Sequence, residues 1–298
     1  MKINGVFIED TFAEAFGMTA TRIIITAANE RWARQAAVTM TGFATSVIAC
    51  GVEAGIEMML PPDQTPDGRP GVAVLMFSIS GTELEKQLEK RLGQCILTCP
   101  TTAAFAGMES EKKIRLGKGL RYFGDGYQIS KLIDGKRYWR IPVMDGEFLV
   151  EETTSRSSAI GGGNFLILAR SQNAALAAAE AAIEVMDPLP GVIMPFPGGV
   201  VRSGSKVGSK YKALSASTND AYCPTLTGLT ESKLSTDVKA VLEIVIDGVD
   251  EESINQAMIA GIGAVCERGT DNGILAITAG NYGGKLGKFH FKLRELMA

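Results

Sequence analysis

Residues Ala240–Gly280 read AVLEIVIDGVDEESINQAMIAGIGAVCERGTDNGILAITAG, and this stretch decides the fold class. Its apolar, β-branched start, Ala240–Asp247, predicts a strand. Glu251–Glu267 predicts a helix, and we interpret the acids Asp250–Glu252 as groups that stabilise its N-terminus rather than as metal ligands. Ile274–Ala279 predicts a second strand. The stretch therefore has the order strand, helix, strand.

The residues before this stretch have a similar pattern. Asn164–Ala169 (NFLILA) predicts a strand, Asn173–Met186 is alanine-rich and predicts a helix, and Val192–Phe196 predicts a short strand. Together with Ala240–Gly280, these segments give the order β-α-β-β-α-β. The middle pair of strands in such an order can be antiparallel, which is typical of α+β folds rather than of parallel doubly wound sheets.

The N-terminal half has the same order of predicted elements. In chain order, we predict a strand at Arg22–Ala27, a helix at Glu30–Met40, strands at Ser46–Cys50 and Val72–Ile79, a helix at Thr82–Leu92 and a strand at Gln94–Cys99. We therefore expect an α+β fold with two ferredoxin-like (βαββαβ) lobes in a pseudo-twofold arrangement. Residues 1–150 would form the N-terminal lobe, with a hairpin insertion in Leu120–Glu152, and residues 151–298 the C-terminal lobe.

Composition narrows the class of protein. The chain has 298 residues, of which 46% are apolar and 21% charged, and this is enough for a packed core. A formal net charge of −3 disfavours a nucleic-acid-binding protein. We expect a cytoplasmic protein without membrane association, because the sequence has neither a signal peptide nor a membrane-spanning stretch. The five cysteines form no CxxC pair, so reduced thiols are favoured over disulfides.

Several common catalytic motifs are absent. Neither GxSxG nor GxGxxG occurs. The segment Asn281–Lys288 (NYGGKLGK) fails as a P-loop because Leu286 follows Lys285 where Ser or Thr is needed, so Mg-ATP chemistry is disfavoured. The single histidine, His290, lies in an alternating segment and is interpreted as structural. No metal site is expected from this set of residues.

Glycine is concentrated in polar loops with the sequences FGDG, GGGN, PFPGG, SGSKVGSK and NYGGKLGK. Each loop alone is compatible with a tight turn. Five such loops in one chain favour an anionic ligand, because glycine exposes backbone N–H groups and lysine adds positive charge. The loop residues expected to bind substrate are Phe123, Gly124, Asp125, Gly126, Gly162, Gly163, Asn164, Pro195, Phe196, Pro197, Gly198, Ser203, Ser205, Lys206, Asn281, Tyr282, Gly283, Lys285 and Lys288.

Glu243 is a lone carboxylate in an otherwise apolar predicted strand. Alternation places it on the same face as Val241 and Val245. If this face is covered, desolvation raises the pKa of Glu243 and makes it an acid near neutral pH. If the face is open to solvent, Glu243 is an ordinary surface residue. The spacing alone favours neither reading.

Longer motifs give a resemblance to a known family. They are INGVFIEDTFAEAF, TGFATSVI, EAGIE, TPDGRPG, LGQCILTCPTTA, YFGDGY, GGGNF, PFPGGVV, SGSKVG, CPTL, EIVIDGVDEE and ITAGNYGGKLGK. Through them, nearly end to end, the sequence resembles the formylmethanofuran:tetrahydromethanopterin formyltransferases of archaeal-type C1 metabolism. The resemblance implies a cytoplasmic homotetramer of two-lobed chains, with no metal and no tightly bound cofactor.

The resemblance also implies the substrates and the reaction. The substrates would be two anionic coenzymes, formylmethanofuran with its carboxylates and tetrahydromethanopterin, or tetrahydrosarcinapterin, with its phosphate. The pterin N5 would attack the formyl carbon and give a tetrahedral intermediate. The resemblance places Glu243 there as the catalytic residue, which would polarise the formyl oxygen or act as a general acid. The glycine-rich loops would hold the coenzymes.

Three alternatives stay open at this point. In the first alternative, the chain is a coenzyme-binding subunit of a formyltransferase/hydrolase complex and has no activity of its own. In the second, it is an unrelated amidohydrolase that acts on an anionic amide. This second alternative is disfavoured because the usual metal ligands and the catalytic triad are missing. Cys99 and Cys223, each followed by Pro-Thr, leave open a mechanism with a covalent intermediate.

Overall fold

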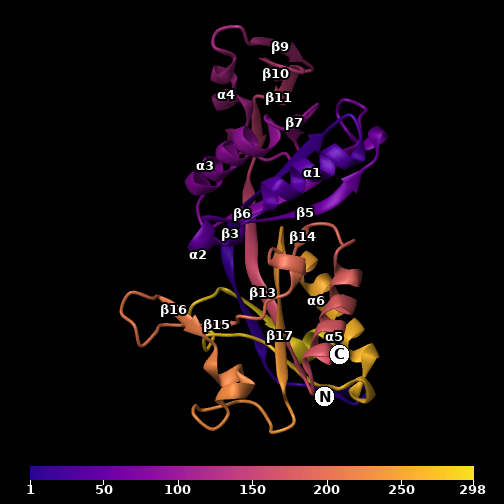
Figure 1. The fold of residues 1–298 in the computed structure, drawn as a ribbon, viewed down its shortest axis with the longest axis vertical. Coiled ribbons are helices and arrows are strands. Elements are labelled where there is room, and N and C mark those ends of the chain that lie inside the picture. Colours follow the sequence, from indigo (N-terminus) through magenta and orange to yellow (C-terminus); the bar gives the residue numbers. More distant parts are fainter. The chain divides into compact units, whose positions relative to one another are not determined.

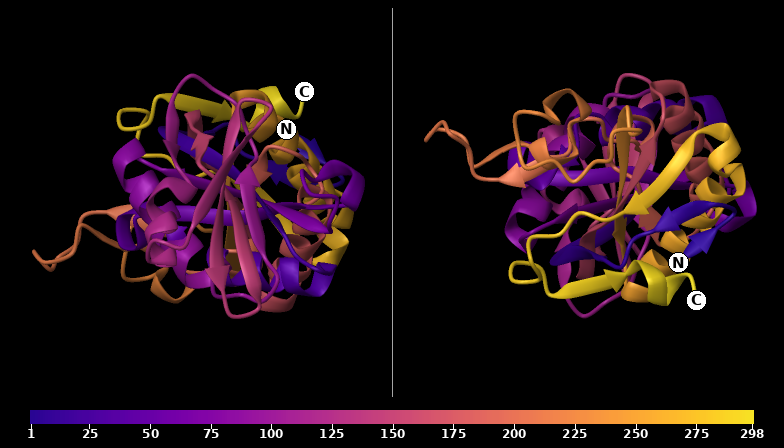
Figure 2. Two further views of the ribbon diagram at one scale, coloured as in Figure 1. Left: turned by 90° about the horizontal axis from the view of Figure 1, so that it is seen from above. Right: turned by 90° about the horizontal axis from the view of Figure 1, so that it is seen from below.

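The computed structural model describes the whole chain from Met1 to Ala298 and divides it into two compact units (Figures 1 and 2). One unit, here called the N-lobe, is Met18–Ala159; the other, the C-lobe, combines Met1–Gly17 with Ile160–Ala298. The linear division at residue 150 stays a prediction, and the two units differ from it because the first 17 residues belong with the C-terminal part. None of the helices is long and apolar enough to span a membrane.

The N-lobe contains one predicted β-α-β-β-α-β unit. Its elements are β3 (Phe12–Thr26, from Met18 onward in this lobe), α1 (Glu30–Thr41), β5 (Val52–Leu60), β6 (Gly71–Ser78), α3 (Gly81–Arg91) and β7 (Ala103–Ala106). The strands lie in the order β5-β6-β3-β7, and all neighbours are antiparallel. The first strand thus lies between the third and the fourth, as in ferredoxin-like folds.

The C-lobe repeats this topology. Its elements are β13 (Ser157–Ala169, from Ile160 onward in this lobe), α5 (Gln172–Met186), β14 (Val192–Ile193), β17 (Ala240–Gly248), α6 (Glu251–Arg268) and β18 (Ile274–Thr278). The order β18-β13-β17-β14 is again antiparallel throughout. The α+β class and the ferredoxin-like order predicted for each half are confirmed by these pairings.

Strand pairing explains why the N-terminus belongs to the C-lobe. β1 (Lys2–Ile3) pairs with β2 (Val6–Ile8), and β2 runs parallel to β18. The start of β3 pairs with β19 (Phe289–Lys292). The two ends of the chain consequently lie side by side (Figures 1 and 2).

Shorter elements complete the two lobes. In the N-lobe they are β4 (Thr45–Ser46), α2 (Val47–Cys50), β8 (Lys113–Arg115), α4 (Gly117–Leu120), β9 (Ile129–Ile133), β10 (Lys136–Val143), β11 (Gly146–Glu151) and β12 (Thr153–Ser155). In the C-lobe they are β15 (Ser205–Val207), β16 (Ala216–Thr218) and α7 (Leu293–Leu296). The segment between β15 and β16 extends away from the other strands of the C-lobe (Figure 2).

Two predicted strands of the N-lobe are wrong. Most of Ser46–Cys50 is the short helix α2, which the Ser46 side chain caps and Gly51 ends in the left-handed region, and the strand follows as β5. Gln94–Cys99 continues the helical path of α3 in a π-type turn at Leu92–Ile96, and the strand comes later as β7. Both segments are short apolar runs, for which periodicity does not separate strand from helix.

The sheet of the C-lobe has two different faces. Phe165 on β13 and Ile244 and Ile246 on β17 are fully buried beneath α5 and α6, which lie side by side on that face (Figure 1). A side chain at Gly163 would meet Ile254 of α6 at 2.7 Å, so glycine permits this helix to pack closely. Because side chains alternate along a strand, Glu243 lies on the opposite face.

Candidate functional site

Glu243 lies in the middle of β17, with strand partners on both sides. Leu166 of β13 is its register partner on one side. On the other side, the backbones of Glu243 and Val201 exchange two hydrogen bonds of 2.7 and 2.9 Å. The strand position of this carboxylate is therefore fixed by backbone pairing alone, and its side chain is turned away from α5 and α6.

The environment of Glu243 keeps part of it protonated near neutral pH. The residue is half-buried, and burial raises its pKa to about 7. A Cβ atom on Gly204 would lie 3.2 Å from its Oε2, so the backbone of this loop passes directly over the carboxylate. The first of the two sequence-based readings, a covered face, is thus the one that the structure supports.

Tyr282 is the second functional group whose environment includes the charge of Glu243. Its phenol pKa is raised by burial and, to a smaller extent, by the charges of Glu243 and Glu14. The ring is 38% exposed and lies 6.0 Å from the ring of Phe16. A protonated phenol on a partly exposed residue is a suitable hydrogen-bond donor to a substrate oxygen.

The backbone N–H groups of Asn281–Lys288 are used differently from the expectation. Tyr282 and Gly284 donate to Oε2 of Glu14, and Leu286 and Gly287 donate to its Oε1. These amides face inward and bind a carboxylate of the chain itself. Lys285 and Lys288 are exposed and make no ion pair, so they are the groups of this loop that are available to an anion.

The Asn164 side chain forms hydrogen bonds with backbone groups of the chain itself. Its Oδ1 accepts a 2.6 Å hydrogen bond from the Gly280 N–H, and its Nδ2 donates to the carbonyls of Gly280 and Gly162. Gly162 in turn donates its N–H to Asp247. The prediction of a loop at GGGN is wrong, because Gly161–Asn164 lie within β13 and pair with β17. From this strand, Asn164 ties β13 to the end of β18, directly before the loop that carries Tyr282.

The two predicted loops that precede β17 in the sequence lie on either side of Val201, the backbone partner of Glu243. Pro195–Gly198 connects β14 to Val201, and Ser203 and Ser205 are exposed on either side of Gly204. Lys206 is paired with Asp220 at 2.7 Å, so its charge is already neutralised within the loop. Of the five predicted loops, SGSKVGSK approaches the Glu243 carboxylate through Gly204, PFPGG leads into the Val201 bridge, and NYGGKLGK carries Tyr282, whose phenol pKa is raised in part by the charge of Glu243.

The predicted FGDG loop, Phe123–Gly126, belongs to the N-lobe. Phe123 and Gly124 are the last residues of a short 3-10 turn, and Asp125 and Gly126 follow it. Phe123 is 65% exposed.

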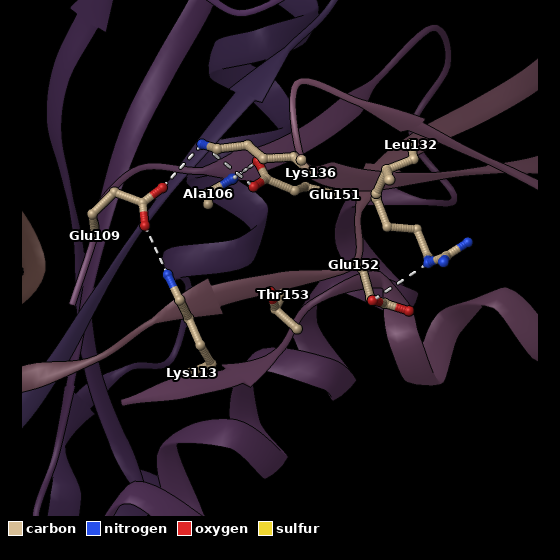
Figure 3. Close-up of a pocket in the computed structure, with 10 residues that line it drawn as sticks. Ala106, Glu109, Lys113, Leu132, Lys136, Glu151, Glu152 and Thr153 are labelled. Carbon is tan, nitrogen blue, oxygen red and sulfur yellow. Dashed lines mark hydrogen bonds and ion pairs between the residues drawn. The ribbon is translucent and has the colours of Figure 1, made fainter. Parts of the chain in front are cut away.

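The N-lobe also has a cavity of about 340 Å³ (Figure 3). Glu109 bridges Lys113 and Lys136 in it, and these pairs lower the pKa of Glu109 to about 2.

One structural reading from the sequence is confirmed. Asp250 caps α6 by accepting a 2.8 Å hydrogen bond from the Ser253 N–H. The interpretation of His290 as structural stays a prediction: the residue is exposed on β19, with its ring 4.8 Å from that of Phe12. The five cysteines are all free thiols.

Sequence reasoning missed Glu14 and Gly204. Glu14 is an acid inside the apolar segment FAEAFG, which is the same signal that singled out Glu243. Gly204 was covered only as part of the SGSKVGSK loop, and nothing in one sequence distinguishes it from the other glycines there. Its role follows from a distance to a residue 39 positions away in the chain.

Comparison with known proteins finds matches along the whole chain. The family model of formylmethanofuran-tetrahydromethanopterin formyltransferase matches residues 1–143, and the model of the proximal lobe of this formyltransferase matches residues 146–296. The chain is 68% identical to the formylmethanofuran–tetrahydromethanopterin formyltransferase of Methylobacillus flagellatus, with both chains covered completely.

Two solved structures are similar over the whole chain. A chain of the formyltransferase/hydrolase complex from Methylorubrum extorquens, crystallised with methylofuran, has a TM-score of 0.97 and 53% identity, covering 100% of this chain and 99% of its own. The formylmethanofuran:tetrahydromethanopterin formyltransferase from Methanosarcina barkeri has a TM-score of 0.93 and 52% identity, covering 99% and 100%.

Proposed function

Because the chain belongs to the formylmethanofuran-tetrahydromethanopterin formyltransferase family, we propose that it transfers a formyl group between formylmethanofuran and N5 of tetrahydromethanopterin or tetrahydrosarcinapterin. The observation that carries the proposal is Glu243, a half-buried carboxyl whose pKa is raised by burial to about 7. Such a group is an acid at the pH of the cytoplasm, where we expect the enzyme to work.

In the proposed reaction, N5 attacks the formyl carbon and a C–N5 bond forms. The formyl oxygen gains negative charge, and Glu243 in its protonated form stabilises it by donating a hydrogen bond or delivers a proton to the leaving nitrogen. The bond from carbon to the methanofuran nitrogen then breaks. N5 gives up one proton and the methanofuran amine gains one, so no redox partner is needed.

Binding of the coenzymes is assigned to the loops. Lys285 and Lys288 would attract carboxylates or phosphate. The exposed Ser203 and Ser205 offer hydroxyl groups beside Glu243. The homotetramer and the assignment of Phe123–Gly126 to a coenzyme are part of the same proposal and rest on the family resemblance.

A spectrophotometric assay of the purified chain with both coenzymes tests the function. We expect formyl transfer by the chain alone, and strict dependence on the pterin. Release of formate without the pterin would instead indicate hydrolysis. Activity that appears only after addition of other subunits would indicate a dependent component of a complex, which is how the structurally similar Methylorubrum extorquens protein is assembled.

A further inference from the structure

Glu14 is a buried charge with an unusual set of partners. The residue is only 1% exposed, and no lysine or arginine pairs with it. Its two carboxylate oxygens instead accept four backbone hydrogen bonds of 2.7 to 2.8 Å from the loop Asn281–Lys288. Burial alone would raise its pKa, but these four donors outweigh it and lower the pKa to about 2. Glu14 is therefore an anion at every physiological pH.

The loop sequence is suited to surrounding this carboxylate. Gly283 and Gly284 both have positive φ angles, of 80° and 72°, and the N–H groups of Tyr282 and Gly284 on this turn both point at Oε2 of Glu14. At Gly287, a Cβ atom would lie 2.4 Å from the carbonyl oxygen of Ala15. The glycines of NYGGKLGK therefore let the loop close on Glu14.

The same contacts fix Tyr282. Its backbone N–H is one of the four donors to Glu14, and its ring packs at 6.0 Å from Phe16, two residues further along β3. Its hydroxyl interacts electrostatically with both Glu14 and Glu243. The position of Tyr282 thus depends on a loop that Glu14 holds at four amides and that the Asn281 side chain ties to Thr11 and to the Phe12 carbonyl.

We propose that Glu14 is a positioning residue for formyl transfer: its carboxylate holds the loop Asn281–Lys288 and thereby places the Tyr282 hydroxyl beside Glu243 as a second hydrogen-bond donor to the reacting formyl oxygen. This role rests on the proposed function. Glu14 itself does not contact substrate, and it acts only through the loop amides and Tyr282.

The first test is Glu14→Gln. A glutamine amide presents one oxygen and one NH₂ group, so half of the inward-facing N–H groups lose their acceptor. We expect hydrogen exchange in the peptide containing residues 281–288 to become about tenfold faster while peptides from α5 and α6 are unchanged. Turnover should fall about 10- to 100-fold with KM changed less than about twofold. Glu180→Gln, on the exposed side of α5, is the matched control.

A loop-side pair of variants avoids disturbing the core, should Glu14→Gln fold poorly. Leu286→Pro removes one N–H donor to Glu14, whereas Leu286→Ala removes the same exposed side chain and keeps the donor. We expect faster loop exchange and reduced turnover for the proline variant alone. Equal exchange and equal turnover in the two variants would overturn the proposal.

A double-mutant cycle shows whether Glu14 acts through Tyr282. Tyr282→Phe and the double variant Glu14→Gln/Tyr282→Phe should have turnover within about twofold of each other. Once the Tyr282 hydroxyl is absent, Glu14 has no hydroxyl left to position, so its replacement should cause no further loss. Multiplicative losses would overturn the coupling. If the wild-type chain does not transfer formyl groups, the proposed function fails, and the loop exchange of Glu14→Gln, which needs no coenzyme, still decides whether Glu14 holds the loop.

Discussion

A methyl group on Gly204 would lie 3.2 Å from Oε2 of Glu243, closer than most side chains approach a neighbour. The same loop is held to β17 by the paired backbones of Val201 and Glu243. The loop therefore cannot move away from the carboxylate without breaking this bridge. Glycine at position 204 is the residue that leaves Glu243 in place beneath the loop.

Gly204→Ala should consequently lower turnover about tenfold, because a shift of a few tenths of an ångström in a reacting group is costly. The unfolding free energy should change by less than about 1 kcal/mol, since the displaced atom is the movable end of a side chain. Gly228→Ala, where nothing lies within 4 Å, is the control. Steady-state kinetics measure the turnover, and thermal unfolding measures the change in stability. Wild-type turnover for Gly204→Ala would contradict the proposal that a side chain at position 204 displaces the Glu243 carboxylate.

The pKa of Glu243 predicts the pH profile of the reaction. If its protonated form is the active acid, turnover stays level below about pH 7 and falls tenfold per pH unit above it. Glu243→Gln should lose this limb and about 10²- to 10⁴-fold of the turnover, with coenzyme binding intact. Near-wild-type turnover of this variant would remove Glu243 from the mechanism.

The same pKa predicts a change of stability with pH. The folded pKa, about 7, lies above the ordinary glutamate value of 4.5, so the folded state binds the proton more tightly. Wild-type stability relative to Glu243→Gln should be highest below about pH 4.5 and should fall by on the order of 3 kcal/mol as the pH rises through 7. Denaturant unfolding of both proteins between pH 5 and 8 measures the difference. A constant difference across this range would contradict the raised pKa.

The order of elements in each half could be predicted from sequence because strands such as Asn164–Ala169 and helices such as Glu30–Met40 have clear periodicity or composition. Two short apolar segments, Ser46–Cys50 and Gln94–Cys99, could not, since a cap and a helical continuation decide their structure. The association of the first 17 residues with the C-lobe depends on strand pairing across most of the chain.

The site was predictable to a similar extent. Glu243 stands out as a charge within an apolar strand, but its pKa depends on the loop at Gly204, whose path one sequence does not reveal. The loop Asn281–Lys288 was recognised as rich in N–H donors, whereas its acceptor, Glu14, lies 268 or more residues away. The composition of the loop indicates that backbone N–H donors are present, but it does not indicate which group accepts their hydrogen bonds.

Asn164 should matter for stability more than for binding. Asn164→Ala removes the acceptor of the partly buried Gly280 N–H and one of the two donors to the Gly280 carbonyl, so we expect a loss of about 1–3 kcal/mol in unfolding free energy. Asn173→Ala, at the exposed start of α5, should change it by less than about 0.5 kcal/mol. Urea unfolding measures both. An equal effect of the two changes would show that the Asn164 clamp contributes nothing.

Lys285 and Lys288 should contribute to binding without taking part in the chemistry. Both are exposed, lack ion-pair partners and flank the amides that Glu14 occupies, so their charge is available to an anionic coenzyme. The variant Lys285→Ala/Lys288→Ala should raise KM about three- to tenfold at low salt, with turnover unchanged and a smaller effect at high salt. Lys239→Ala, whose Nζ donates only to the Thr236 carbonyl, should leave both constants unchanged. A fall in turnover at constant KM would instead place the lysines at the reacting atoms.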